Sequence, residues 1–432
     1  MSILIKNSKV IDPRHKLAEV LDVLISDGKI AKIGKNISLS AAEIVDGTGK
    51  VLLPGFIDLH VHFREPGGEH KETVATGAFA ALKGGFVGAV SMPNTQPPAD
   101  NAAIVEFILK RAREANFNIF PCGTLSKARE GKEISSMLEL KQAGCVAVSD
   151  DGSYLKNPVV ARHAFEYAAQ LGLMIMSHAE IPELTKGGVI NEGFASTLLG
   201  LKGMPAVAEV IAVATDIELA KMTGARLHIS HISTRGALEK VRLAKREGLS
   251  VTCEVTPHHL ALTEDAIKEY NTNFKMNPPL RTEDDRQAMI EGIKDGTIDI
   301  IATDHAPHQF EEKDQEFELA PFGVIGLETA FAISYSEICL KEKMPLDKLI
   351  NQLAVHPASL LKLQNFNEIK EGSEANVTLL DLNRKWTVNQ EDFVSKSKNS
   401  CFIGRQVHGY VEATVCSGKL YLWNKMSAKV AK

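Results

Sequence analysis

Residues 56–66 read FIDLHVHFREP, an apolar segment that ends with two histidines, His60 and His62. Side chains alternate along a β-strand, so both histidines leave the same face and can reach one metal ion. The segment stops before a Glu-Pro-Gly-Gly turn, and ligands gather at the mouths of strands in parallel α/β folds. One surface histidine beside one hydrogen-bonded core histidine would be the ordinary alternative. The position of the pair at a strand end favours a metal site.

Seven further strand-like segments follow this one, with helical segments between them. Strands are predicted over residues 56–62, 87–93, 117–124, 145–150, 173–178, 226–231, 250–255 and 298–304. Helices are predicted over residues 101–115, 133–143, 159–170, 206–222, 235–246 and 283–294. The last helix has a capping pattern, Thr282 with Asp285 three residues on. No glycine-rich phosphate loop follows the first strand, so we predict an α/β fold with a (β/α)8 TIM-like barrel.

Both ends of the chain are rich in β-forming residues. An Asp-Gly turn divides residues 21–33, a Ser-Gly turn divides residues 407–423, and residues 376–382 form a further strand candidate. Isolated hairpins are only marginally stable in water, so we expect the two ends to meet in a small β-sandwich. The predicted domains are this sandwich, residues 1–53 plus 368–432, and the barrel, residues 54–367.

The composition suits a large folded core and excludes several kinds of partner. The chain has 432 residues, 44% of them hydrophobic and 24% charged, enough for one large α/β domain and an appendage. A net charge of −5 without a basic stripe argues against nucleic acid. The six cysteines form no C-x-x-C pair, and the chain shows no apolar leader and no bilayer-spanning run. We therefore expect a cytoplasmic protein with reduced thiols and no membrane partner.

Polar side chains stand at the ends of most predicted strands. Each has an ordinary explanation when taken singly, because a histidine can be satisfied in a core and an aspartate can cap the next segment. The carboxyl ends of barrel strands converge on one mouth, however, and together these nitrogen and oxygen ligands suit Zn²⁺ or a similar ion. The residues are His60, His62, Asn94, Asp150, Asp151, His178, His231 and Asp304.

Seven motifs then carry a family resemblance. They are DLHVHFREPGGEHKET, SMPNTQPPADN, SDDGSY, SHAE, ISHIST, MNPPLR and ATDHAPH. Together they resemble the amidohydrolase superfamily and, more narrowly, the dihydroorotases of the Asp-bridged bacterial type. The resemblance spans the barrel and both β-rich ends. It implies a zinc-dependent enzyme that reversibly hydrolyses the cyclic amide of dihydroorotate to N-carbamoyl-aspartate in de novo pyrimidine (UMP) biosynthesis.

The resemblance also implies two Zn²⁺ ions per chain and one catalytic aspartate. The implied ligands are His60, His62 and Asp304 for the first metal, His178 and His231 for the second, and Asp151 between them. Asp304 would also take a proton from water and deliver it to the departing ring nitrogen. Asp150 is the weaker choice for the bridge. Many relatives place a carboxylated lysine at the end of the fourth strand, where this chain has Asp151, so the occupancy of the second site is left open.

A further set of residues is implied to bind the substrate. They are His62, Arg64, Asn94 and His308 near the carboxylate, and Asn277 with the backbone of Phe322 and Gly323 on the pyrimidine ring. Arg64 alone would be an ordinary surface arginine, or a two-pronged carboxylate partner on the face of His62 if the strand persists. The acidic segment 311–316 fits a solvated loop and a mobile lid over residues 309–320 equally well.

Neighbouring histidines are predicted to lie outside the metal site. His305, next to Asp304, should face away, and His228 should lie on the opposite face of its strand from His231. At most one of the adjacent His258 and His259 should approach the site.

Two other classes of function remain open. Hydantoinases, dihydropyrimidinases and allantoinases share the metals but need no arginine aimed at a ring carboxylate. A non-catalytic partner of aspartate carbamoyltransferase would have lost ligands, and all the expected ligands are present. A homodimer and association with aspartate carbamoyltransferase are expectations from the family.

Overall fold

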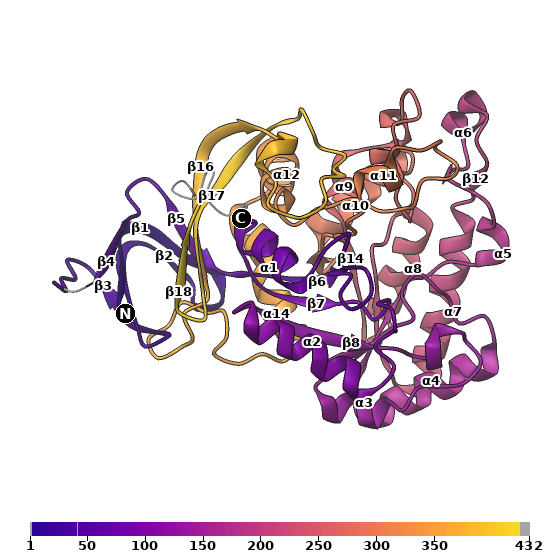
Figure 1. Ribbon diagram of the computed structural model, residues 1–432, viewed down its shortest axis with the longest axis horizontal. Coiled ribbons are helices and arrows are strands. Elements are labelled where there is room, and N and C mark those ends of the chain that lie inside the picture. Colours follow the sequence, from indigo (N-terminus) through magenta and orange to yellow (C-terminus); the bar gives the residue numbers. More distant parts are fainter. Residues whose placement is uncertain (1, 41, 424–432) are drawn as a thin grey trace.

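Eight parallel strands form a barrel in this computed structural model, which describes residues 2–40 and 42–423 (Figure 1). The strands are β6 (Phe56–Val61), β7 (Phe86–Ser91), β8 (Asn118–Gly123), β9 (Ala147–Val148), β10 (Met174–Ser177), β13 (Arg226–Ile229), β14 (Val251–Val255) and β15 (Ile300–Ile301). Each pairs with the next in chain order. The ring closes where Val61 bridges His305 and the His62 N–H donates to the His305 carbonyl at 2.9 Å. The predicted barrel and its strands are confirmed.

The six predicted helices are also confirmed, within a few residues at each end. They are α2 (Ala102–Glu114), α3 (Met137–Ala143), α4 (Pro158–Leu171), α7 (Val207–Thr223), α8 (Arg235–Arg246) and α10 (Glu283–Asp295). Thr282 caps α10 by accepting the N–H of Asp285 at 3.3 Å, as the spacing predicts. Shorter helices are α5 (Pro182–Thr185), α6 (Phe194–Leu199), α9 (Pro257–Ala261), α11 (Phe310–Lys313), α12 (Ala330–Ser334), α13 (Leu346–Ile350) and α14 (His356–Leu360). A small two-stranded sheet pairs β11 (Ile190–Asn191) in parallel with β12 (Gly203–Met204).

The helical segments 330–341 and 346–360 were not predicted, and neither was α1 (Val74–Lys83), between β6 and β7. Its sequence, VATGAFAALK, is mostly small and apolar, so it offers no polar stripe to mark a helical period. Thr73 caps its first turn in a reciprocal pair with Thr76, and six of its ten residues are buried. Packing between neighbouring elements therefore stabilises a segment that has little helical pattern of its own.

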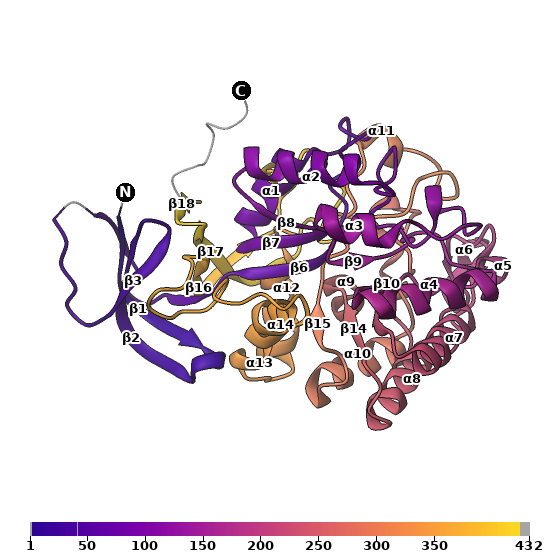
Figure 2. The ribbon, with the colours of Figure 1, turned by 90° about the horizontal axis from the view of Figure 1, so that it is seen from below.

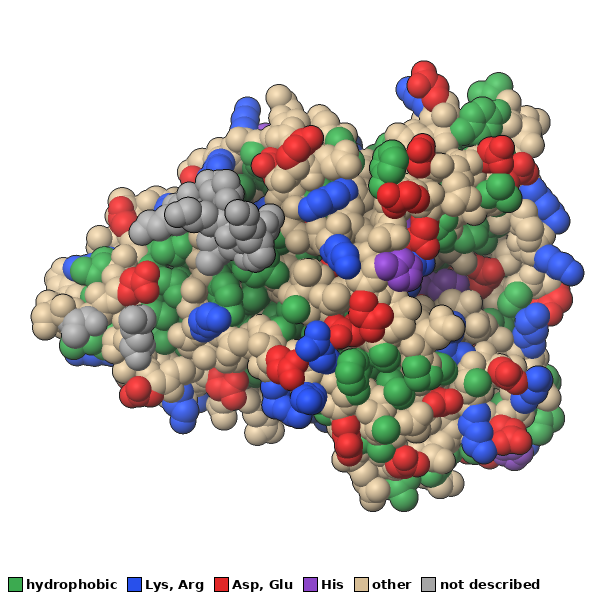
Figure 3. Space-filling view, viewed as in Figure 1, with side chains coloured by type: hydrophobic (Ala, Val, Ile, Leu, Met, Phe, Trp, Pro, Cys, Tyr) green, Lys and Arg blue, Asp and Glu red, His purple; other side chains and the backbone are tan. Residues whose placement is uncertain are grey.

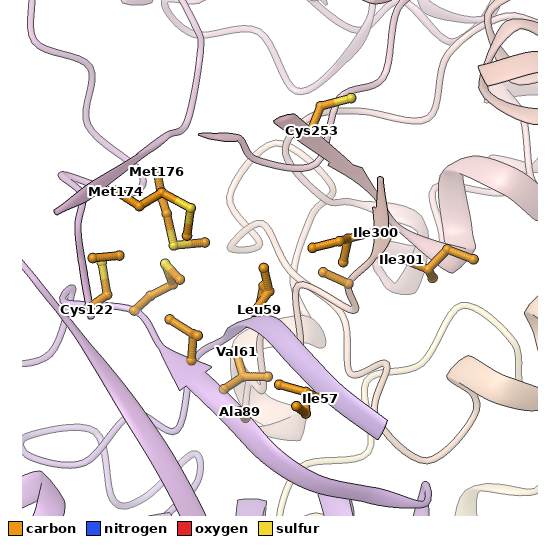
Figure 4. Packing of buried hydrophobic residues seen from close by; sticks show 14 of the residues in the cluster. Ile57, Leu59, Val61, Ala89, Cys122, Met174, Met176, Cys253, Ile300 and Ile301 are labelled. Atoms are coloured by element: carbon orange, nitrogen blue, oxygen red, sulfur yellow. The ribbon is translucent and has the colours of Figure 1, made fainter. Parts of the chain in front are cut away.

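The barrel strands have one apolar and one polar face where they approach the mouth. Ile57, Leu59 and Val61 of β6 are fully buried and pack with Ala89 of β7 in the main core (Figure 4). The alternate residues of β6 include His60 and therefore face the opposite way. This alternation directs the metal-ligand candidates toward the barrel interior.

The two ends of the chain meet in a second, β-rich unit beside the barrel, as predicted (Figure 2). Its strands are β1 (Ile3–Asp12), β2 (Leu17–Ser26), β3 (Lys29–Gly34), β4 (Glu43–Asp46), β5 (Val51–Pro54), β16 (Val377–Thr387), β17 (Gln406–Cys416) and β18 (Lys419–Leu422). Antiparallel pairing of β5 with β16 joins the two ends. Turns at residues 27–28 and 417–418 connect the hairpins, as the sequence predicts.

The connection between β16 and β17 leaves this sheet and packs on the barrel loops. Val394 and Ser395 donate their N–H groups to Glu328 at 3.0 Å, and Asn399 contacts the loop that follows Asp304. The C-terminal region therefore contributes to the surroundings of the barrel mouth. The exact domain boundaries stay a prediction.

Candidate metal centre

Six predicted ligands meet at the carboxyl ends of the barrel strands. The His62 Nε2 and Asp304 Oδ1 atoms are 3.0 Å apart, and His60 Nε2 lies 3.2 Å from Asp151 Oδ1. On the other side of Asp151, the His178 Nδ1 and His231 Nε2 atoms are 3.0 Å apart. Two three-residue groups could each hold an ion, and Asp151 belongs to both: His60, His62 and Asp151, then Asp151, His178 and His231.

The two adjacent aspartates of the fourth strand end face different surroundings. The Asp151 carboxylate lies 3.6 Å from His178 Nδ1 and 3.9 Å from His231 Nε2, besides its contact with His60. The Asp150 carboxylate instead accepts the N–H groups of Leu125 and Ser126 at 2.9 and 3.0 Å. Asp150 therefore anchors a neighbouring loop, and only Asp151 faces both groups of histidines.

The donor set fits divalent metal ions. His60 Nε2 is buried without a hydrogen-bond partner, although Asp151 and Asp304 oxygens lie within 3.7 Å of it. A buried imidazole nitrogen aimed at carboxylates without hydrogen-bonding geometry is what a missing cation between them would leave. Imidazole nitrogens with carboxylate oxygens are ligands that Zn²⁺ accepts.

Three residues of this site have a strained backbone. Arg64, His231 and Asp304 have φ angles of +60°, +32° and +48°, in the left-handed region that side chains other than glycine rarely adopt. Each such residue costs about 1–3 kcal/mol and persists only where the surrounding structure holds it. The strain at three neighbouring site residues is typical of a functional site.

The two aspartates are held ionised. Burial alone would raise the pKa of the Asp304 carboxyl, but the hydrogen bond with His62 and the nearby His60 outweigh burial and bring that pKa below its usual value. Burial likewise opposes the shift at Asp151, and the surrounding histidines still hold its pKa well below the usual range. Both carboxylates are therefore available as ligands at neutral pH.

Arg64 and His308 lie together beside this cluster, with the backbone of Phe322. His308 Nε2 is 2.9 Å from the Phe322 carbonyl oxygen and 3.2 Å from Arg64 Nη2. Burial and the positive charge of Arg64 lower the pKa of His308 to about 3, so its imidazole is neutral. The strand does not persist to Arg64, because β6 ends at Val61 and the left-handed backbone at Arg64 turns the chain. Arg64 is nevertheless brought to the barrel mouth.

Asn94 and Asn277 flank the cluster from two sides. The His62 Nδ1–H donates to Asn94 Oδ1 at 2.8 Å, which leaves His62 Nε2 free to bind metal, and Asn94 Nδ2 donates to Asp151 at 3.1 Å. Asn277 Nδ2 donates to Glu180 at 2.7 Å, while Asn277 Oδ1 is buried without a partner. An unpaired buried acceptor at the mouth can receive an N–H group of a bound ring.

Gly323 approaches its neighbours too closely to carry a side chain. Its φ is +130°, and a Cβ atom there would lie 2.8 Å from the Ala306 side chain and 3.3 Å from His308. The backbone of residues 322–323 can therefore come close to whatever His308 contacts. The predicted substrate residues thus contact one another or the ligand cluster: Arg64 and His308 lie with Phe322 and Gly323, Asn94 contacts His62 and Asp151, and Asn277 contacts His178. A hollow with histidine side chains is visible in the space-filling view (Figure 3).

The loop over residues 309–323 is anchored by a buried lysine. Lys313 Nζ donates to the carbonyls of Pro321 and Gly323, both at 3.0 Å, and the side chain is 5% exposed. Burial lowers the pKa of Lys313 to about 7. These contacts tie α11 to the backbone beside His308. They indicate an anchored segment rather than a solvated loop.

Removing this anchor is expected to weaken substrate binding more than turnover. Lys313→Ala deletes both bonds to the segment that carries Gly323, and hydrogen bonds to charged groups contribute about 1.5–3 kcal/mol. We expect the KM for substrate to rise about tenfold or more with a smaller change in kcat. Steady-state kinetics check this, with exposed Lys268→Ala as the control. An unchanged KM in Lys313→Ala would show that the loop needs no such anchor.

Of the histidines near the cluster, His305 lies as predicted and His228 does not. His305 faces away from the metal cluster, with its Nε2 3.5 Å from buried Glu72, as expected. His228 was expected on the opposite face from His231, but strand β13 ends at Ile229 and His231 has a left-handed backbone, so alternation does not extend to it. The His228 ring and the His231 backbone N–H both contact Glu254.

Three residues at this site were missed from the sequence: Glu254, Lys313 and Asn399. Asn399 accepts the N–H of His308 at 3.1 Å and donates to the carbonyls of Ala306 and Gly323. It comes from the connection between β16 and β17, more than ninety residues after Asp304. Its sequence, KSKNSC, carries no pattern that indicates this contact.

Comparisons with known proteins agree with this fold. The structure superimposes on an L-hydantoinase (dihydropyrimidinase) from Arthrobacter aurescens with a TM-score of 0.86, at 24% identity over 97% of this chain and 95% of that one. A dihydropyrimidinase from Brevibacillus agri gives a TM-score of 0.85, also at 24% identity, over 98% and 95%. This barrel, with histidines and aspartates at its mouth, places the protein in the amidohydrolase class.

Closer similarity is found in sequence. A family model described as dihydro-orotase-like matches residues 49–237. The dihydroorotase of Carboxydothermus hydrogenoformans is 48% identical over 97% of each chain, and that of Trichlorobacter lovleyi is 48% identical over 97% of this chain and 99% of its own. The chain belongs to the dihydroorotase family. None of the helices within residues 2–40 and 42–423 is long and apolar enough to cross a membrane.

Proposed function

We propose that this chain hydrolyses (S)-dihydroorotate reversibly to N-carbamoyl-L-aspartate, as a dihydroorotase of de novo pyrimidine biosynthesis. The observation that carries the proposal is the position of Arg64 and His308 directly beside the histidine–aspartate cluster. A planar guanidinium binds a carboxylate through two parallel hydrogen bonds. Dihydroorotate presents a carboxylate on the ring whose amide is to be opened, whereas hydantoin and allantoin lack one.

The metal centre is proposed to hold two Zn²⁺ ions. His60, His62 and Asp304 would bind the first ion, His178 and His231 the second, and Asp151 both. Zinc supplies a Lewis acid that polarises the ring carbonyl and lowers the pKa of water to about 7. Support comes from the two groups of ligand atoms and from the unpartnered His60 Nε2.

Asp304 is proposed to move the proton. Its ionised carboxylate takes a proton from the attacking water as the water oxygen bonds to the ring carbonyl carbon. The carbon–nitrogen bond then breaks, and Asp304 returns the proton to the departing ring nitrogen, which gives a carbamoyl group and a new carboxylic acid that releases its remaining proton to solvent. Arg64, Asn94 and His308 hold the ring carboxylate meanwhile, and Asn277 with residues 322–323 orients the ring.

A homodimer, association with aspartate carbamoyltransferase and a cytoplasmic location are further proposals from the family. The six free cysteines agree with a reducing compartment. Light scattering of the purified protein, alone and mixed with aspartate carbamoyltransferase, tests the first two.

A substrate panel tests the proposed reaction against its relatives. Purified, zinc-loaded protein is assayed with dihydroorotate, hydantoin, dihydrouracil and allantoin. We expect the highest kcat/KM for dihydroorotate. A higher value for hydantoin, dihydrouracil or allantoin would assign the chain to a sibling hydrolase, and no turnover of any of them would indicate a non-catalytic partner.

Arg64 is the residue on which substrate choice depends most. Arg64→Lys keeps the charge but replaces a two-pronged contact with a point charge, so kcat/KM for dihydroorotate should fall roughly 10-fold to 100-fold, about 1.5–3 kcal/mol. Arg64→Met should lose more. Metal content measured by mass spectrometry should stay at the parent value in both variants, because Arg64 is no ligand. If Arg64→Met turns over dihydroorotate as well as the parent, another group binds the carboxylate.

A further inference from the structure

A carboxylate buried beneath the metal centre contacts residues from two other strands of the barrel, β6 and β13. Glu254 lies on β14 and is 0% exposed. Its Oε1 atom accepts from His60 Nδ1 at 2.8 Å and from the His231 N–H at 3.3 Å. Its Oε2 atom lies 3.0 Å from His228 Nε2, and His228 Nδ1 lies 2.8 Å from Thr252 Oγ1. Both carboxylate oxygens are therefore engaged, and the group cannot rotate freely.

A structural role alone would not favour a carboxylate at this position. Burying an ionised carboxylate is costly, and replacing a buried ion pair by apolar residues of similar size is often neutral or stabilising. The neighbouring residues of β14, Cys253 and Val255, are fully buried and show that this strand otherwise carries uncharged side chains inside the fold. What distinguishes position 254 is its contact with the ring of a metal-ligand candidate.

The contact decides which nitrogen of His60 is available. A carboxylate accepts hydrogen bonds, so His60 must carry a proton on Nδ1, and in the neutral imidazole that binds metal its Nε2 is then bare. That same Nε2 is the buried atom without a hydrogen-bond partner that faces Asp151 and Asp304. Asn94 does the equivalent for His62 by accepting from its Nδ1.

We propose that Glu254, held in place by His228, is a positioning residue that fixes the ring orientation and tautomer of His60 and thereby sets the affinity of the first metal site. The proposal rests on the metal centre of the proposed function. Outer carboxylates that accept from a ligand histidine typically change metal affinity 10-fold to 100-fold when removed. Glu254 would act on the metal only through His60.

The test compares two buried carboxylates of the barrel, Glu254 on β14 and Asp58 on β6. Glu254→Gln keeps the shape but removes the charge beside the His60 ring. Asp58→Asn is the matched control, because Asp58 is also 0% exposed but accepts the backbone N–H groups of His60 and Thr303, at 3.0 and 3.1 Å, and not an imidazole. Zn²⁺ affinity is measured by competition with a chromophoric chelator. We expect Glu254→Gln to bind the tighter Zn²⁺ about 10-fold to 100-fold more weakly and Asp58→Asn to bind it like the parent.

A spectroscopic measurement on the parent protein covers the case in which Glu254→Gln does not fold. In ¹⁵N-histidine-labelled protein loaded with ¹¹³Cd²⁺, His60 should couple to the metal through Nε2 and carry a proton on Nδ1. Coupling through Nδ1, or an unchanged Zn²⁺ affinity in folded Glu254→Gln, would overturn the proposal. Turnover of dihydroorotate by the parent is scored separately. If the parent binds zinc but does not turn over dihydroorotate, the proposed function is contradicted and the role of Glu254 stands. If the parent turns over dihydroorotate and Glu254→Gln binds Zn²⁺ as tightly as the parent, the role of Glu254 is contradicted and the proposed function stands.

Discussion

Asp304→Asn is expected to keep the fold and lose nearly all turnover. The asparagine has nearly the same shape, but it cannot take a proton from water, and its amide is a poorer metal ligand than the carboxylate that lies 3.0 Å from His62 Nε2. General acid–base catalysis alone contributes roughly 10²–10⁴-fold, so we expect kcat to fall about 10³-fold or more, equivalent to about 4 kcal/mol of barrier. Steady-state assays with dihydroorotate measure this.

Metal content decides how the Asp304→Asn result is interpreted. The variant should be assayed after zinc reconstitution, with bound zinc measured on the same sample and the fold checked by circular dichroism. Loss of kcat at full zinc occupancy would assign the proton transfer to Asp304. Turnover close to that of the parent at full zinc occupancy would contradict the assignment of the proton transfer to Asp304.

Asp151→Ala is expected to have the second large effect, on metal binding as well as rate. Asp151 is the residue shared by the two groups of ligand atoms, so its removal takes a ligand from both. The zinc content should fall from two equivalents to about one or lower, and the second ion should leave first because only His178 and His231 would remain to hold it. Hydrolysis of dihydroorotate should fall with it.

Asp150→Ala is the matched control for this experiment. Asp150 has the same residue type one position earlier, but it anchors the N–H groups of Leu125 and Ser126. Its removal should lower the free energy of unfolding and leave the zinc stoichiometry unchanged. If Asp150→Ala loses zinc and Asp151→Ala does not, the bridging role belongs to Asp150.

Much of the fold could be predicted because its patterns are local. Most barrel strands are short, largely apolar runs with a polar residue at or just after the end, and the two hairpin turns at the ends of the chain have favoured turn residues. Helix α1 shows the limit of this approach. Its small apolar residues have no helical stripe, and only packing against neighbouring elements explains its conformation.

The candidate ligands could be found from the sequence because they follow strands in a regular way, but their supports could not. Glu254 stands inside strand β14, where alternation indicates only which face it occupies, and its two imidazole partners lie 26 and 194 residues away. Asn399 and Lys313 donate to backbone carbonyls near His308. Every residue has a backbone carbonyl, so the sequence does not indicate which ones these side chains contact. Arg64 reached the site by a left-handed turn that a strand pattern does not indicate.

Stepwise zinc reconstitution tests the central claim most directly. The purified protein is stripped of metal by a chelator, and hydrolysis of dihydroorotate is followed as Zn²⁺ is added back and bound zinc is counted. The account predicts no measurable hydrolysis by the stripped protein and a rate that rises with bound zinc until the sites at His60, His62, Asp151, His178, His231 and Asp304 are filled. Full activity in the stripped protein, or no hydrolysis of dihydroorotate at saturating zinc, would contradict it.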